Sequence, residues 1–127
     1  MNIPPELEAF TATFNLARYW ESHEVLEPAW RRTRSRFYHG LILYASAWVH
    51  AERGNRTGVL AQLDKADPVL VTYRPAYLGV DLDQLVKDSH RLREDAETGR
   101  LSELTRAPIR LESTLVRGDE PELSDSV

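Results

Sequence analysis

The stretch 37-FYHGLILYASAWVHAERG-54 decides the fold. If it is a helix, which turns by about 100° per residue, its apolar side chains form two adjacent rows instead of one. A helix that is apolar this far round its circumference is typical of the centre of a bundle, because it must be covered from more than one side. Gly54 can end this helix, and Asn55 can cap the next one. The two rows are Phe37, Leu41, Tyr44 and Trp48, and Tyr38, Ile42, Ala45 and Val49.

Two helices are predicted before this central segment. The first, over about 4–15, opens at a Pro-Pro pair, which the first turn of a helix tolerates. The second, over about 17–32, contains Pro28, which predicts a kink or a local break because proline lacks the backbone N–H.

Two more helices are predicted after the central segment. One begins near Arg56, and the Asp-Pro pair that ends at Pro68 bends or ends it. A loop over 73–80 follows, and the last helix is capped by Asp81 and ended by Gly99. No run of useful length alternates with a period of two. We therefore expect an all-α protein, an antiparallel bundle of four to five helices with short links.

The length of 127 residues suits one domain with a core of its own. We expect a single helical domain over 1–116, followed by an acidic C-terminal tail over 117–127. The tail has few large apolar side chains, and this composition predicts disorder.

Composition excludes several classes of function. The chain has no cysteine, which rules out disulfides, thiolate zinc sites and cysteine nucleophiles. The N-terminus has no basic run followed by an apolar core, and the longest apolar run falls well short of the roughly 20 residues of a membrane span, so we expect a cytoplasmic protein that binds no membrane. The net charge is −4 and basic residues cluster only at 31–36, so no nucleic acid is expected as a partner.

The candidate site lies in 19-YWESHEVLEPAW-30. His23 and Glu27 are four residues apart and are therefore neighbours on one helical face. They lie inside an aromatic stripe, where a carboxylate and an imidazole must be paired or hydrogen-bonded if they are buried. The aromatic members of the stripe are Tyr19, Trp20 and Trp30.

Three roles for this pair remain open. In the first, His23 and Glu27 bond each other or nearby groups and tie the helix packing together. In the second, they are two ligands of a divalent metal, with Glu24 or His50 as further ligands, although two ligands are a weak signal. In the third, they perform acid–base chemistry on a small ligand without a metal.

The same residues carry a family resemblance. The segments "FNLARYWESHEVLEPAW", "FYHGLILYASAWVHAERGN" and "GVLAQLDKA" resemble the bacterial and archaeal family catalogued as domain of unknown function 309, over roughly 10–85. The resemblance implies an all-α bundle and no established activity. It marks His23, Glu24 and Glu27 as the hallmark polar residues. The matching positions are Phe14, Asn15, Tyr19, Trp20, Glu21, His23, Glu24, Leu26, Glu27, Trp30, Phe37, Gly40, Leu41, Ile42, Gly54 and Asn55.

The leading hypothesis is a binding or interaction module that takes an unknown protein or small ligand in a groove near His23, Glu24 and Glu27. Polar anchors beside Trp20 and Trp30 suit a partly apolar pocket. The alternative is a metal-dependent hydrolase that uses His23, Glu24 and Glu27. A third interpretation makes the pair purely structural and places function elsewhere, for example at a homo-oligomer interface.

Overall fold

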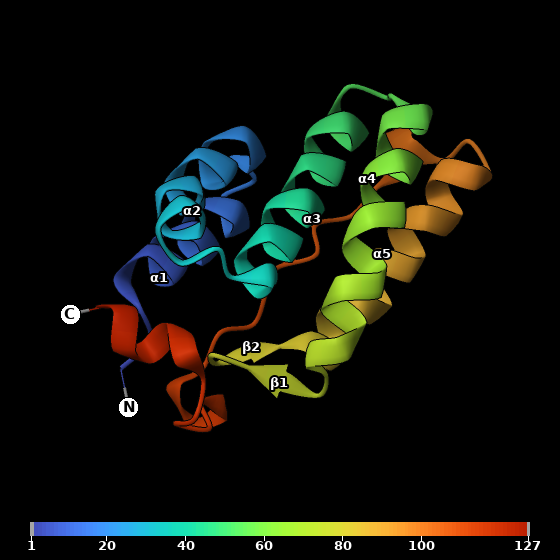
Figure 1. Cartoon of the computed structure of the whole chain (residues 1–127). Helices are drawn as coiled ribbons and strands as arrows, with labels where there is room; N and C mark the ends of the chain where they lie inside the picture. Colours follow the sequence, from blue (N-terminus) through green and yellow to red (C-terminus); the bar gives the residue numbers. More distant parts are fainter. Residues whose placement is uncertain (1, 127) are drawn as a thin grey trace.

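The structure, a computed structural model, describes residues 2–126 and the side chains of 2–124. Within this range the prediction of an all-α bundle is confirmed: five α-helices carry the fold beside one small hairpin (Figure 1). None of the helices described is long and apolar enough to cross a bilayer. The helices are α1 (Pro5–Asn15), α2 (Tyr19–Thr33), α3 (Arg36–Glu52), α4 (Arg56–Leu70) and α5 (Leu82–Glu97); the strands are β1 (Ala76–Tyr77) and β2 (Val80–Asp81); and the 3₁₀ helices are η1 (Val71–Tyr73), η2 (Leu101–Glu103), η3 (Ser113–Leu115) and η4 (Pro121–Ser126).

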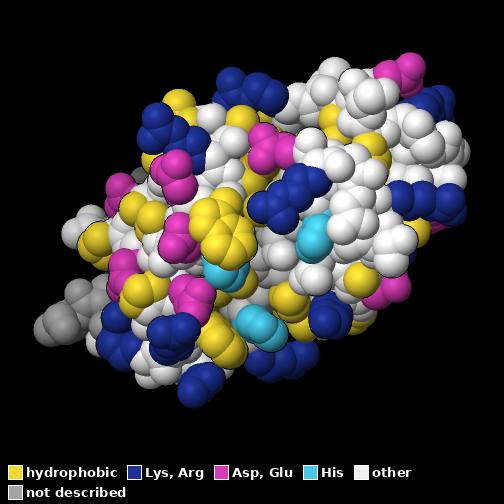
Figure 2. Space-filling view, turned by 90° about the horizontal axis from the view of Figure 1, so that it is seen from above, with side chains coloured by type: hydrophobic (Ala, Val, Ile, Leu, Met, Phe, Trp, Pro, Cys, Tyr) yellow, Lys and Arg dark blue, Asp and Glu magenta, His cyan; other side chains and the backbone are white. Residues whose placement is uncertain are grey.

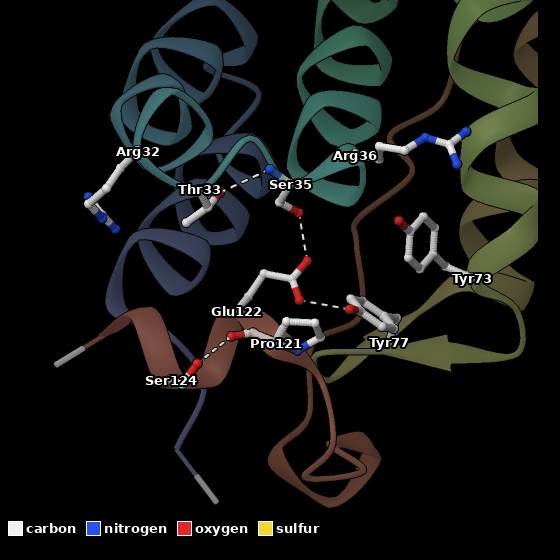
Figure 3. A pocket seen from close by; sticks show the side chains of 9 residues that line it. All are labelled: Arg32, Thr33, Ser35, Arg36, Tyr73, Tyr77, Pro121, Glu122 and Ser124. Atoms are coloured by element: carbon white, nitrogen blue, oxygen red, sulfur yellow. Dashed lines mark hydrogen bonds between the residues drawn. The ribbon is translucent and has the colours of Figure 1, made fainter.

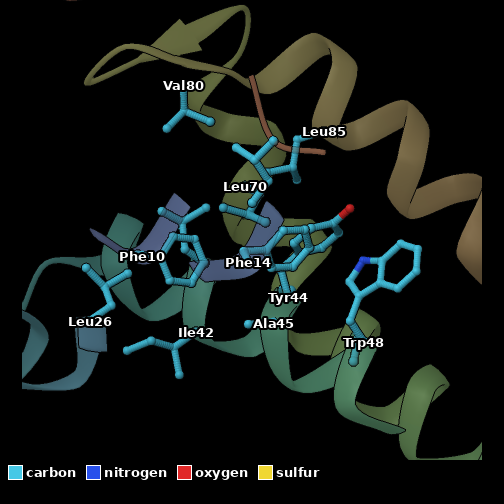
Figure 4. Close-up of a cluster of buried hydrophobic side chains, with 14 of the residues drawn as sticks. Phe10, Phe14, Leu26, Ile42, Tyr44, Ala45, Trp48, Leu70, Val80 and Leu85 are labelled. Carbon is cyan, nitrogen blue, oxygen red and sulfur yellow. The ribbon is translucent and has the colours of Figure 1, made fainter. Parts of the chain in front are cut away.

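Helix α3 lies at the centre of the bundle, as its two apolar rows predict. It packs against α2 on one side and α4 on the other, while α1 lies against α2 and α5 against α4 (Figure 1). Aromatic rings join α1 to α3 in the core (Figure 4): the Phe14 ring stacks on Tyr44 with centroids 5.7 Å apart and meets Trp48 edge-on at 6.2 Å. Both rows of α3 are buried along their whole length.

Neither internal proline ends its helix. Helix α2 continues past Pro28 to Thr33, and α4 continues past Pro68 to Leu70, so a break at the first and a helix end at the second are wrong. A proline removes one intrahelical hydrogen bond, and tertiary contacts can outweigh that loss. In α4 the turn before the proline is anchored to α5, because Arg93 donates to Asp67 over 3.1 Å.

The predicted loop over 73–80 contains the hairpin β1–β2 instead. A late extended segment runs beside it, since Leu111 forms an antiparallel bridge with Val80. The same segment is tied to α1, because the Asn15 amide donates to the carbonyl of Ile109 over 3.0 Å and accepts from its N–H over 2.8 Å.

The acidic tail is packed, and the expectation of disorder is wrong for its described part. The tail lies beside the hairpin (Figure 1), and the carboxylates of Glu120 and Glu122 are buried there, with only 3% and 7% of each residue exposed. Leu123 packs against the core, and hydrogen bonds to the two buried carboxylates supply the further anchors of this segment. The donors to Glu120 are the backbone N–H groups of Leu78, Arg117 and Gly118, and the donors to Glu122 are the hydroxyls of Ser35 and Tyr77.

Candidate functional site

Helix α2 presents His23, Glu27 and Trp30 on one face, because these residues are four and then three positions apart. The Nε2 atom of His23 lies 3.5 Å from Oε2 of Glu27, and the guanidinium of Arg31 contacts the same carboxylate. The side chains of His23 and Glu27 are 24% and 26% exposed. The pair is therefore neither sealed in the core nor fully solvated.

Each of two imidazoles in this region stacks on an indole. The rings of Trp20 and His23 have centroids 5.3 Å apart, and those of Trp30 and His39 are 4.7 Å apart and tilted by only 16°. The guanidinium of Arg34 lies 5.1 Å from the Trp30 centroid. Stacking orients both imidazoles. The Nδ1 atom of His23 is buried and has no hydrogen-bond partner among the described residues.

These groups line an open groove of about 270 Å³. Its walls combine apolar side chains with a few polar groups, as small-molecule sites do. Figure 2 shows histidine side chains on this face of the molecule, set among hydrophobic, acidic and basic side chains. The lining residues are His23, Glu27 and Trp30 from α2, His39, Ile42, Leu43 and Ser46 from α3, and Gln62 from α4.

The groove contains half of the six residues predicted for the site. His23, Glu27 and Trp30 line it, and Trp20, which is 57% exposed, borders it through its stack on His23. Tyr19 turns into the core instead and is 6% exposed. Glu24 is exposed and lies outside the lining.

The sequence prediction did not find the contributions of α3 and α4. His39, Ser46 and Gln62 complete the polar part of the lining from two other helices. A periodic pattern describes one helix at a time, so it cannot show which faces of separate helices meet. The only signal available for His39 was its place at the start of the central helix.

The described residues offer the pair no further metal ligand. No group of three His, Cys, Asp or Glu side chains within 2–124 is placed to hold an ion. His50, which was considered as a further ligand, lies with its Nδ1 atom 3.1 Å from the amide nitrogen of Asn55. A catalytic zinc site normally takes three protein ligands, so this geometry does not favour the metal interpretation.

Comparison with known proteins agrees with the family resemblance. The family model described as Domain of unknown function (DUF309) matches residues 7–61, from α1 into α4. This segment contains every residue that lines the groove except Gln62. No curated protein and no solved structure matches the chain.

Proposed function

We propose that this chain, which carries the DUF309 segment over residues 7–61, is a binding module for a small, partly apolar ligand. The observation that carries the proposal is the position of His23 and Glu27, which border an open groove of about 270 Å³. A purely structural pair would gain most from being closed off from water, where its hydrogen bonds are strongest.

The lining suggests the chemistry of the ligand. Ile42 and Leu43 supply apolar surface, and the stacked rings of Trp30 and His39 supply a rigid aromatic wall. The Glu27 carboxylate accepts hydrogen bonds, and a neutral imidazole offers one donor and one acceptor. These features together fit a compact ligand with an apolar body and a hydrogen-bond donor directed at Glu27.

A fragment screen by ¹H–¹⁵N NMR tests the proposal. We expect bound fragments to shift the indole N–H signal of Trp30 and to lose their effect in Leu43→Trp, which fills the groove. His90→Ala, which changes an exposed histidine outside the groove, serves as the control. Fragments that bind elsewhere, or that bind the filled variant equally well, would contradict the proposal.

A protein partner is the second candidate. Leu16 and Trp20 are 65% and 57% exposed, and Trp20 reaches the groove through its stack on His23. An exposed apolar side chain of the size of Trp20 beside a groove is common at interaction sites. This candidate predicts that Trp20→Ala weakens capture of the partner, whereas small fragments bind that variant normally.

A metal-dependent hydrolase that uses His23, Glu24 and Glu27 is the alternative. Only the neighbouring placement of His23 and Glu27 favours it. It predicts stoichiometric zinc or manganese in protein purified without chelator, with the metal lost in His23→Ala. Elemental analysis of both proteins decides between this alternative and a metal-free binding module.

A further inference from the structure

A second and larger hollow, of about 520 Å³, lies where α2 ends and α3 begins (Figure 3). We call it the tail cavity, because the C-terminal tail forms one of its walls. It shares no lining residue with the groove beside His23. The lining residues are Arg32, Thr33, Ser35, Arg36, Tyr73, Tyr77, Pro121, Glu122 and Ser124.

The negative group of the tail cavity is the carboxylate of Glu122. Its two oxygens accept hydrogen bonds from the hydroxyls of Ser35 over 2.6 Å and Tyr77 over 2.7 Å. Burial and then the bond to Glu122 raise the pKa of the Tyr77 hydroxyl, which therefore stays a donor. Both donors are neutral, and Glu122 forms no ion pair with any residue among 2–124. Buried carboxylates are normally paired with a cation, and Glu122 has none bonded directly to it among the described residues.

Two cations line the cavity, Arg32 and Arg36. Arg32 donates to Glu6 over 2.7 Å, so the positive group considered for a ligand is Arg36, the first residue of α3. It is exposed and forms no ion pair with the residues that the structure describes. Figure 3 shows Glu122 on the tail side of the cavity and Arg36 on the side of Tyr73. Burial raises the pKa of Tyr73, the charge of Glu122 raises it further, and that of Arg36 lowers it, so both charges act on this ring.

Two aromatic rings form the wall between the charges. Tyr73 and Tyr77 meet edge to face with centroids 4.6 Å apart. The Phe37 ring contacts both, with its centroid 5.0 Å from that of Tyr73 and 4.7 Å from that of Tyr77. Aromatic faces attract ammonium groups. The guanidinium of Arg117 already lies 5.2 Å from the Tyr77 centroid, so the ring available to a ligand cation is that of Tyr73.

We propose that the tail cavity binds a small zwitterion of the amino-acid class, with its ammonium group at Glu122 and its carboxylate at Arg36. An acid or a free phosphate would pair with Arg36 but would be repelled by Glu122. A simple amine would pair with Glu122 but would be repelled by Arg36. Only a ligand that carries both charges satisfies both groups. The volume of about 520 Å³ lies within the roughly 300–1,000 Å³ typical of ligand pockets.

The test uses the intact chain and the free protein amino acids, each added singly at millimolar concentration. We expect at least one to raise the melting temperature and to shift the backbone NMR signals of Ser35, Arg36 and Tyr77. The amine and the acid analogues of that amino acid, each lacking one charge, should bind at least about tenfold more weakly, because each loses one charge-assisted hydrogen bond.

Two variants locate the site. Glu122→Gln keeps the shape and removes the charge, and Arg36→Gln changes an exposed side chain, so it remains informative if the first variant is unstable. Each should weaken binding by about tenfold or more. Arg53→Gln, at the opposite end of α3, is the matched control and should bind normally.

Several results would overturn the proposal. These are no binding by any amino acid, equal binding by the acid or amine analogue, tighter binding of inorganic phosphate, or unchanged binding by both variants. Because the tail cavity and the groove share no residue, failure here leaves the proposed function of the groove standing.

Discussion

At the scale of single residues, His23 and Glu27 are partly buried without being locked in place. The Nε2 atom of His23 and the Oε2 atom of Glu27 are 3.5 Å apart, and about a quarter of each side chain is exposed. Water reaches both side chains and screens the interaction, and pairs that are screened by solvent contribute about 0–1 kcal/mol. The proposed binding role is compatible with a pair that contributes little to the stability of the bundle.

Glu27→Ala is accordingly expected to cost less than about 1 kcal/mol in the free energy of unfolding. Urea denaturation measures it, with Leu41→Ala as a reference, because that fully buried side chain should cost about 2–5 kcal/mol. A loss of about 2–4 kcal/mol for Glu27→Ala would show instead that the pair is structural.

The orientation of α2 shows where a helical pattern stops being informative. The stripe that contains His23 and Glu27 was predicted from spacing, and it does face other helices. The two ends of the stripe along α2, however, face different surroundings: Tyr19 packs on Phe14 in the core, while Trp30 stacks on His39 at the groove. Spacing gives the directions of side chains relative to one another, and the neighbouring helices decide which of them meets solvent.

At the scale of helices, Gly40 is a position where α3 packs closely against α4. A Cβ atom there would lie 2.9 Å from Cδ2 of Leu70 and 3.2 Å from Cγ1 of Val69. Leu70 is fully buried and cannot simply swing into solvent. Glycine at this position lets the two helices pack closely, at some cost to the intrinsic stability of α3.

Gly40→Ala should therefore destabilise the protein by about 1 kcal/mol, because overpacking outweighs the roughly 1 kcal/mol that alanine gains over glycine in a helix. Thermal or urea denaturation checks the value. The double variant Gly40→Ala with Leu70→Ala is the control: it should lose less than the sum of the two single variants, since removing Leu70 makes room for the methyl group. Additive losses would mean that the two positions do not collide.

Local signals predicted the helices well and their interruptions poorly. Asn55 and Asp81 cap α4 and α5 as expected, with side chains that accept from the N–H groups of Gly58 and Gln84 over 3.0 Å each. Pro68 was expected to bend or end α4, yet the helix continues past it beside α5. A capping side chain accepts a hydrogen bond from a backbone N–H within four residues, so local sequence reveals it. Whether a helix continues past a proline depends on contacts with distant segments, which local sequence does not reveal.

At the scale of the whole molecule, the tail depends on contacts between residues far apart in the chain. Glu122 meets Ser35, which is 87 residues away, and Glu120 meets the N–H of Leu78, which is 42 residues away. Composition alone predicts disorder for such a segment, because it has few apolar groups. Buried, hydrogen-bonded carboxylates are the physical reason for the difference, and no local pattern reveals them.

Glu120 makes the attachment of the tail sensitive to pH. Burial acts to raise the pKa of its carboxyl group, but backbone N–H donors, including those of Arg117 and Leu78, outweigh this effect and hold the pKa below the ordinary value of 4.5. A carboxyl group whose pKa is lowered by folding stabilises the protein above its unfolded pKa, and this contribution disappears as the pH falls through the folded pKa. The stabilisation should therefore be complete at neutral pH and decline below about pH 4.5.

Glu120→Gln imitates the protonated group and should lower the free energy of unfolding by about 1.5–3 kcal/mol at pH 7, the range for hydrogen bonds to charged groups. The difference between the two proteins should stay constant down to about pH 4.5 and then shrink, because the wild type becomes protonated as well. Urea denaturation over a series of pH values measures it, and Glu103→Gln, at an exposed position, should show no difference at any pH. A difference that persists unchanged at low pH would assign the loss to packing of the amide, and the carboxylate charge would then have no part in holding the tail.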